Sequence, residues 1–348
     1  MEDNKLKQEK DILDSNNNNN INFHFLYEIT KDSYSDICTS NIFTIFKSNY
    51  NILYLIYSND NKAIIGFDLN QNKKIIEIKN CHKNCISNLR HYFNEINKTD
   101  LILSVSYIDN NIKIWDTNKW ECILNLTSVN KKGFLISAYF IKDNDQIYVI
   151  TSNYTWNNKS EPIKIFDFKG NITKKINESN DMTFFIDTYY NNKMKYNFII
   201  SGNYNYIKSF NYDKNELYHI YYDNDNKSHF SVIIKDDEEI IKLIESCIDG
   251  FIRIWDFNSG LLLKKINIKN KCLLYSLCLL DNNYLFITCE DRSIKLIDLK
   301  KEKIIQSLFG HNNRVLHIEK INLNKYGDCL ISQGYQNDQI RIWSYKYL

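Results

Sequence analysis

The sequence has one proline and nine glycines among its 348 residues. So few glycines leave little backbone that could cradle a phosphate, and neither a Gly-Lys-Ser/Thr phosphate loop nor a Gly-x-Gly-x-x-Gly fingerprint is present. A Gly-x-Ser-x-Gly nucleophile elbow is also missing. These absences argue against the enzyme classes that depend on those motifs.

Long apolar runs and an excess of one charge are lacking as well. No uninterrupted apolar stretch approaches about 18 residues, so no membrane span is predicted. The 44 Lys and Arg nearly balance the 42 Asp and Glu, and no long basic run indicates a nucleic-acid footprint. The first ten residues have no apolar core typical of a signal peptide. We expect an intracellular chain, cytoplasmic or nuclear.

Nine cysteines are scattered through strand-like patterns and loops. An odd count without secretory context favours free, mostly buried thiols in a reducing compartment. The segment Cys81-His82-Lys83-Asn84-Cys85 offers three potential zinc ligands, but their spacing is not a standard ligand pair. We therefore predict no metal and no cofactor.

A short apolar motif, first seen in full as Ile112-Lys113-Ile114-Trp115-Asp116, recurs along the chain. Its fourth position is occupied in turn by Phe67, Trp115, Phe166, Phe210, Trp255, Ile297 and Trp343. Successive copies lie 42 to 51 residues apart. Self-similarity at this period predicts a repeat architecture.

Four alternating runs separated by polar turns accompany each copy, which predicts a four-stranded meander. In the second unit these runs are 86–93, 101–107, 111–116 and 121–126. Such a sheet has two apolar faces that it cannot bury alone, and radial stacking of neighbours buries both. The sequence predicts an all-β, seven-bladed β-propeller over residues 21–348, a single domain of four-stranded antiparallel blades. Its aromatics, such as Phe184-Phe185, are better explained by packing between blades than by base stacking.

The two ends of the chain predict how the ring closes. The seventh unit lacks a fourth strand, whereas 22–29 forms an orphan alternating strand with Phe23, Phe25, Tyr27 and Ile29 on one side. We predict that this strand completes the last blade, since an open ring would expose a strand edge. Residues 1–20 are polar and rich in Asn, which predicts a disordered tail.

Several motifs resemble the WD40-repeat family. They are Trp115-Asp116, Trp255-Asp256 and Gly310-His311, with Asp109, Asp249 and Asp291 each six residues before the fourth motif position. The resemblance implies a structural hydrogen-bonded set of His82, Ser104 or Ser106, Asp109 and Trp115 in blade two. In blade seven it implies His311, Ser332, Asp338 and Trp343, although Asp338 precedes Trp343 by five residues. The structural positions carried over from the family are His82, Ser104, Asp109, Trp115, Asp249, Trp255, Asp291, His311 and Trp343.

The resemblance also implies a function. We expect a non-enzymatic scaffold, a single ring that binds other proteins within a larger complex. The expected contact positions are Lys83, Asn84, Lys131, Asp181, Asn313 and Arg314. Two alternatives stay open: a nucleic-acid-associated propeller, marked by a basic stripe, and a propeller enzyme, marked by acids or histidines converging in the central opening with shifted titration.

Overall fold

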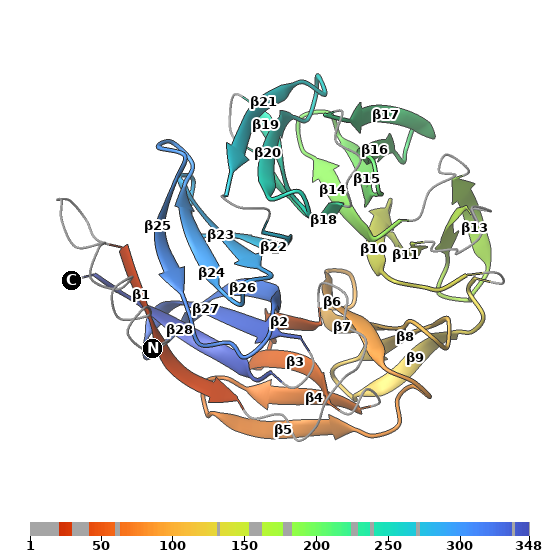
Figure 1. The fold of residues 1–348 in the computed structure, drawn as a ribbon. Coiled ribbons are helices and arrows are strands. Elements are labelled where there is room, and N and C mark those ends of the chain that lie inside the picture. Colours follow the sequence, from red (N-terminus) through yellow and green to blue (C-terminus); the bar gives the residue numbers. More distant parts are fainter. Residues whose placement is uncertain are drawn as a thin grey trace.

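The computed structural model describes residues 21–29, 42–59, 63–130, 133–152, 162–176, 183–223, 229–236, 240–268, 272–335 and 338–347. Their strands form seven four-stranded antiparallel sheets, which stand as blades around a ring (Figure 1). The predicted all-β, seven-bladed propeller is thus confirmed. The predicted tail 1–20, and the expected contact residues Lys131 and Asp181, lie outside the described residues.

Each blade runs from an inner first strand to an outer fourth strand. Blade one consists of β2 (Phe43–Lys47), β3 (Leu53–Asn59), β4 (Ala63–Asp68) and β5 (Lys73–Ile78). Blade two consists of β6 (Ile86–Asn94), β7 (Thr99–Ser106), β8 (Asn111–Asp116) and β9 (Glu121–Leu126). Blade three consists of β10 (Ala138–Asp143), β11 (Gln146–Thr151), β12 (Ile163–Phe166) and β13 (Ile172–Ile176). Blades four and five consist of β14 (Phe185–Asn191), β15 (Tyr196–Gly202), β16 (Ile207–Asn211) and β17 (Glu216–Tyr221); β18 (His229–Asp236), β19 (Ile241–Cys247), β20 (Phe251–Asp256) and β21 (Leu262–Asn267). Blades six and seven consist of β22 (Leu274–Leu279), β23 (Tyr284–Cys289), β24 (Ile294–Asp298) and β25 (Lys303–Leu308); β26 (Val315–Leu323), β27 (Gly327–Gly334), β28 (Ile340–Tyr347) and β1 (Ile21–Ile29).

The recurring motif forms the third strand of every blade. In β8, Ile112 and Ile114 are buried in a cluster with Phe140 and Val149 of blade three. Trp115 faces the other way, into a cluster with side chains of blade one. Because strand side chains alternate between faces, one short motif joins each blade to both of its neighbours.

A one-residue bulge interrupts the outer strand of each blade, next to the fourth motif position. In blade two, Ile114 pairs with Leu124 while Trp115 pairs with Cys122, which leaves Ile123 as the extra residue. The same register shift occurs in the other six blades. A bulge increases local twist and makes an edge a poorer template for pairing with another chain.

The N-terminal strand completes the last blade, as predicted. β1 pairs antiparallel with β28 along its whole length. The side chain of Gln306, in blade six, accepts a hydrogen bond from the Phe23 amide (2.9 Å) and donates one to the Phe23 carbonyl (2.7 Å). Strand β1 therefore completes blade seven and also joins it to blade six.

The predicted alternation within β1 was wrong in one respect. Phe23 packs with blade six, edge-on to Phe286 at 4.9 Å, whereas Ile29 and Tyr27 pack towards blade one. The bulge between Phe25 and Tyr27 shifts the register by one residue and so changes which face the later side chains occupy. Phe25 is left 46% exposed.

Removing β1 should weaken the ring sharply. Phe23 and Ile29 are 3% and 4% exposed, and burying side chains of this size contributes roughly 1.5–3 kcal/mol each. We expect deletion of residues 1–29 to lower the melting temperature by at least about 8 °C, measured by circular dichroism. Deletion of residues 1–20 is the control and should change it little. Equal melting temperatures for the two truncations would contradict closure by β1.

Candidate protein-binding face

Two kinds of connection meet on one side of the ring, which we call the entry face: the loops entering each first strand, and the turns joining second to third strands. In blade two, the Asp109 carboxylate in the turn accepts hydrogen bonds from the backbone amides of Lys83 (2.8 Å) and Asn84 (2.9 Å) in the loop. The Asn84 side chain also donates to Asp109 (2.5 Å). The expected contact residues Lys83 and Asn84 therefore lie on a fixed loop, with the Asn84 amide turned inward.

Blade seven has the complete hydrogen-bonded set implied by the resemblance. His311 Nδ1 lies 2.8 Å from Asp338 Oδ2, His311 Nε2 lies 2.7 Å from Ser332 Oγ, and Trp343 Nε1 donates to the same Oγ at 2.8 Å. Asp338 Oδ2 also accepts from the Asn313 amide (3.2 Å). Burial alone would raise the pKa of Asp338, but His311, the Asn313 amide and the Arg341 charge together outweigh burial and hold that pKa below its usual value.

The shorter spacing in blade seven, five residues instead of six, does not disturb this set. Gly334 explains why the carboxylate fits. A Cβ at position 334 would lie 2.1 Å from Asp338 Oδ2 and 2.7 Å from Asp338 Cβ. The missing side chain thus makes room for Asp338 beside His311.

Blade two has only part of the set. His82 Nε2 lies 2.8 Å from Ser104 Oγ, and Trp115 Nε1 donates to that Oγ at 2.9 Å, so the serine of the set is Ser104. His82 Nδ1 has no hydrogen-bond partner among the described residues. The pKa of His82 is lowered to about 4, first because the ring is buried and second because Lys113 is near. His82 is therefore neutral at physiological pH.

Blade five satisfies its turn carboxylate differently. Asp249 pairs with Arg253 (2.5 Å), whose Nε also donates to Asp223 (2.8 Å). Glu245 occupies the register position of Ser104 and lies 2.8 Å from His229. Trp255 Nε1 has no hydrogen-bond partner in the described part of the chain. Asp249 is therefore held by a cation in place of histidine, and in blade six Asp291 is likewise held by Lys295 (2.5 Å).

Aromatic rings form a continuous chain across blades four to seven on the entry face. Phe184 packs against Tyr204 (4.8 Å) and Phe230 (5.7 Å), and Phe230 packs against Tyr275 (5.5 Å). The Arg314 guanidinium then lies over the rings of Tyr275 (5.6 Å) and Tyr335 (4.3 Å). We call this set the aromatic chain; its members are Phe184, Tyr204, Phe230, Tyr275, Arg314 and Tyr335.

The aromatic chain lies at the mouth of the central opening, because Phe230 also lines the channel there. Tyr204 is 40% exposed, and Arg314, an expected contact residue, is half-buried between two tyrosines. The sequence predicts that aromatics such as Phe184-Phe185 pack between blades. This prediction is correct for Phe185, whereas Phe184 belongs to the aromatic chain.

Acids and a histidine do converge in the central channel, whose volume is about 380 Å³. Arg90 lies 4.0 Å from Asp187 and over the ring of Tyr139 at 4.8 Å. His317 Nε2 lies 3.0 Å from Glu319. Burial raises the pKa of Asp187, and the Arg90 charge acts in the opposite direction. Each channel acid thus faces a basic side chain.

In the described residues, Cys81, His82 and Cys85 do not form a group of three potential ligand atoms close to one another. Cys81 and Cys85 are buried, and His82 is bonded to Ser104. Burial raises the pKa of the Cys81 thiol to about 12.

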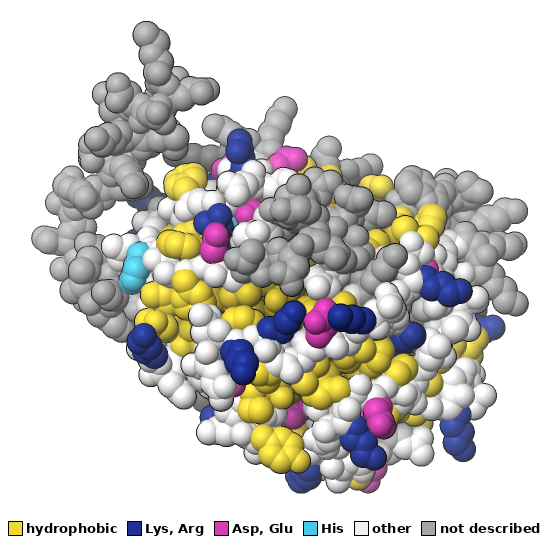
Figure 2. Space-filling view, turned by 90° about the horizontal axis from the view of Figure 1, so that it is seen from below, with side chains coloured by type: hydrophobic (Ala, Val, Ile, Leu, Met, Phe, Trp, Pro, Cys, Tyr) yellow, Lys and Arg dark blue, Asp and Glu magenta, His cyan; other side chains and the backbone are white. Residues whose placement is uncertain are grey.

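Charge is dispersed on the part of the outer rim that Figure 2 shows. There, Lys and Arg side chains are scattered among acidic and apolar ones and do not gather in one stripe. The described residues on this face therefore show no continuous basic track of the kind that phosphate-backbone binding uses.

Comparison with known proteins gives a short local match. A stretch of 73 residues, 21% of this chain, is 27% identical to the U3 small nucleolar RNA-associated protein 21 homolog of Schizosaccharomyces pombe. The match spans 8% of that relative's length. No family model matches the chain. The class that the fold defines is a seven-bladed β-propeller.

The described ranges contain no helix that is long and apolar enough to cross a membrane.

The neutral His82 predicts a specific pH dependence. Its pKa is about 4 in the folded chain and ordinarily 6.5, so the unfolded chain takes up the proton first as pH falls. The part of the unfolding free energy that depends on a neutral His82 is fully present above about pH 6.5 and is lost progressively as the pH falls to about 4. Between about pH 7 and pH 5 the free energy of unfolding should fall by about 2 kcal/mol more than in His82→Asn, measured by urea denaturation. Parallel pH profiles for the two proteins would contradict a neutral, buried His82.

Proposed function

We propose that this chain is a non-enzymatic WD40-like scaffold that binds other proteins through its entry face. The observation that carries the proposal is the aromatic chain ending in Arg314, which is held over Tyr275 and Tyr335 beside the central opening. Tyr, Trp and Arg are enriched among the residues that contribute most to protein interfaces. The half-buried Arg314 and the exposed Tyr204 therefore suit recognition of a protein surface.

Rigidity of the entry face supports this role. The loop carrying Lys83 and Asn84 is held by Asp109, and the loop carrying Asn313 is held by Asp338. A surface already ordered before binding loses little conformational entropy when the partner docks. The loops thus present Lys83 and Arg314 in defined positions.

The channel charges can be explained without catalysis. Asp187 lies within ion-pair distance of Arg90, and Glu319 lies within hydrogen-bond distance of His317. Both acids thus have basic neighbours from other positions in the channel, and a structural role accounts for them.

A second candidate is a protein subunit of an RNA-containing nuclear complex. It is favoured by the local match to a U3 small nucleolar RNA-associated protein. Aromatic side chains at a surface also suit stacking of single-stranded bases. Against direct RNA contact stand the formal net charge of +2 and the dispersed charge on the rim in Figure 2. In this candidate, protein contacts would hold the ring in the complex.

Charge reversal on the entry face should weaken partner capture. We expect Lys83→Glu with Arg314→Glu to lower recovery of co-purifying proteins at least about tenfold, measured by affinity capture from the native cell and quantitative mass spectrometry. The matched control is Lys169→Glu, because Lys169 is exposed in the turn between β12 and β13, on the face of the ring opposite the entry face. Because Arg314 also contacts Tyr275, Tyr204→Ala serves as a milder second variant. Unchanged recovery of co-purifying proteins with both variants would contradict binding through the entry face.

Binding to single-stranded RNA separates the two candidates. For a protein scaffold, we expect the purified full chain to bind a generic single-stranded RNA only weakly, measured by fluorescence anisotropy across a salt series. Tight binding that falls steeply with salt and is lost in Tyr204→Ala would instead support direct RNA contact.

A further inference from the structure

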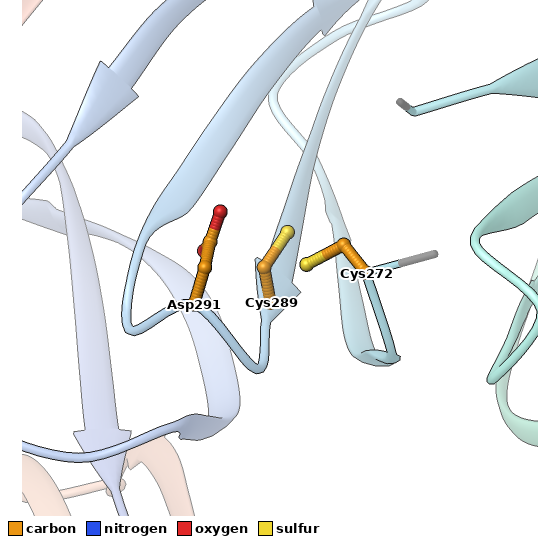
Figure 3. Close-up of side chains that lie close together, drawn as sticks. All are labelled: Cys272, Cys289 and Asp291. Atoms are coloured by element: carbon orange, nitrogen blue, oxygen red, sulfur yellow. The ribbon is translucent and has the colours of Figure 1, made fainter. Parts of the chain in front are cut away.

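Three potential metal ligands come together in blade six, away from the segment that the sequence singled out. Cys272 lies in the loop entering β22, Cys289 ends β23, and Asp291 lies in the turn that follows. One ligand atom from each, two sulfurs and a carboxylate oxygen, lie within 4.8 Å of one another. Figure 3 shows the Cys272 sulfur directed towards Cys289, with Asp291 on the other side of Cys289.

Backbone hydrogen bonds fix this arrangement. The Glu290 amide donates to the Leu273 carbonyl (3.0 Å), which ties the loop to the turn. The Cys289 amide donates to the Ser293 carbonyl (3.1 Å), and the Asp291 carboxylate accepts from the Ser293 amide (3.1 Å). Cys289 is buried, Cys272 half-buried and Asp291 exposed. The group is therefore preorganised and open to solvent on one side.

We propose that Cys272, Cys289 and Asp291 bind a zinc ion. Zinc takes thiolate and carboxylate ligands at about 2.3 and 2.0–2.2 Å in tetrahedral geometry, which places ligand atoms roughly 3.5–4 Å apart. The observed spacing needs only a small contraction. Among the described residues no fourth His, Cys, Asp or Glu joins the group, so a water molecule would complete the tetrahedron.

Lys295 completes the charge balance of this site. Its ammonium lies 2.5 Å from Asp291 Oδ2 and 2.7 Å from Ser293 Oγ. Two thiolates and one carboxylate carry three negative charges, which a zinc ion and Lys295 together neutralise. Ligating carboxylates in metal sites are commonly hydrogen-bonded by outer-shell groups, and Lys295 and Ser293 supply such bonds to Asp291.

Zinc binds thiolates, so uptake would release the protons of both thiols. Metal uptake should therefore strengthen with rising pH.

The zinc site goes beyond the proposed scaffold function and does not depend on it. Tyr275 of the aromatic chain follows Cys272 by three residues. A metal joining Cys272 to the Cys289–Asp291 turn would hold the loop that leads into the aromatic chain.

Zinc uptake by the reduced, full-length chain tests the proposal. After chelation and re-addition of Zn²⁺, we expect about one tightly held zinc per chain, as for a single site, measured by inductively coupled plasma mass spectrometry. Substitution with Co²⁺ should give thiolate charge-transfer absorption. Cys272→Ser and Asp291→Asn should each lose this stoichiometric binding. Cys122→Ser, which removes an exposed cysteine in blade two, is the control and should retain it.

A readout on the unmodified chain covers the case in which a variant fails to fold. Zn²⁺ should slow alkylation of Cys272 by iodoacetamide, followed by peptide mass spectrometry, and should not slow alkylation of Cys122. Zinc uptake unchanged in folded Cys272→Ser, or no protection of Cys272, overturns the proposal. So does failure of the reduced chain to take up zinc, in which case a Cys272–Cys289 disulfide formed with peroxide would identify a redox pair instead.

Discussion

Every blade of this ring depends on its neighbours to bury two apolar faces. The third strand shows the constraint most directly, because Ile112 and Ile114 pack towards blade three while Trp115 packs towards blade one. No blade can bury both faces alone, so the stack must continue until it closes. Pairing of β1 with β28 supplies that closure, and the bulge in β1 lets the same strand pack side chains against both adjacent blades.

The turns between second and third strands follow a second constraint: a carboxylate that folds back against the blade needs a hydrogen-bond donor or a cation. Blade seven supplies His311 for Asp338, whereas blades five and six supply Arg253 for Asp249 and Lys295 for Asp291. Either solution satisfies the carboxylate and holds the turn against the third strand. The divergent blades are therefore regular in shape although their polar residues differ.

These fixed turns determine what the entry face presents. With the loops held from beneath, Arg314 and the aromatic rings of blades four to seven stand in defined positions around the central opening. The same geometry places Cys272 beside Cys289 and Asp291 at the edge of this surface. The proposed protein contact and the proposed zinc site thus depend on one feature, the hydrogen bonds that hold entry loops against the turns of the same blade.

The sequence by itself determined the number of blades, the order of strands and the closure of the ring. These follow from period-2 alternation and from a repeat of 42 to 51 residues, both of which are properties of local sequence. The resemblance to the WD40-repeat family implied His82, His311 and Trp343 as structural positions and left the choice between Ser104 and Ser106 open.

Only the tertiary structure decided which residues from different blades meet. Phe184, Phe230 and Tyr275 lie about one repeat apart along the chain, and radial stacking brings them together. Cys272 and Cys289 are joined by pairing of β22 with β23, a contact that no ligand spacing in the sequence indicates. Asp338 reaches His311 because Gly334 leaves space for its carboxylate. Such contacts depend on register and packing across strands, which a linear pattern does not encode.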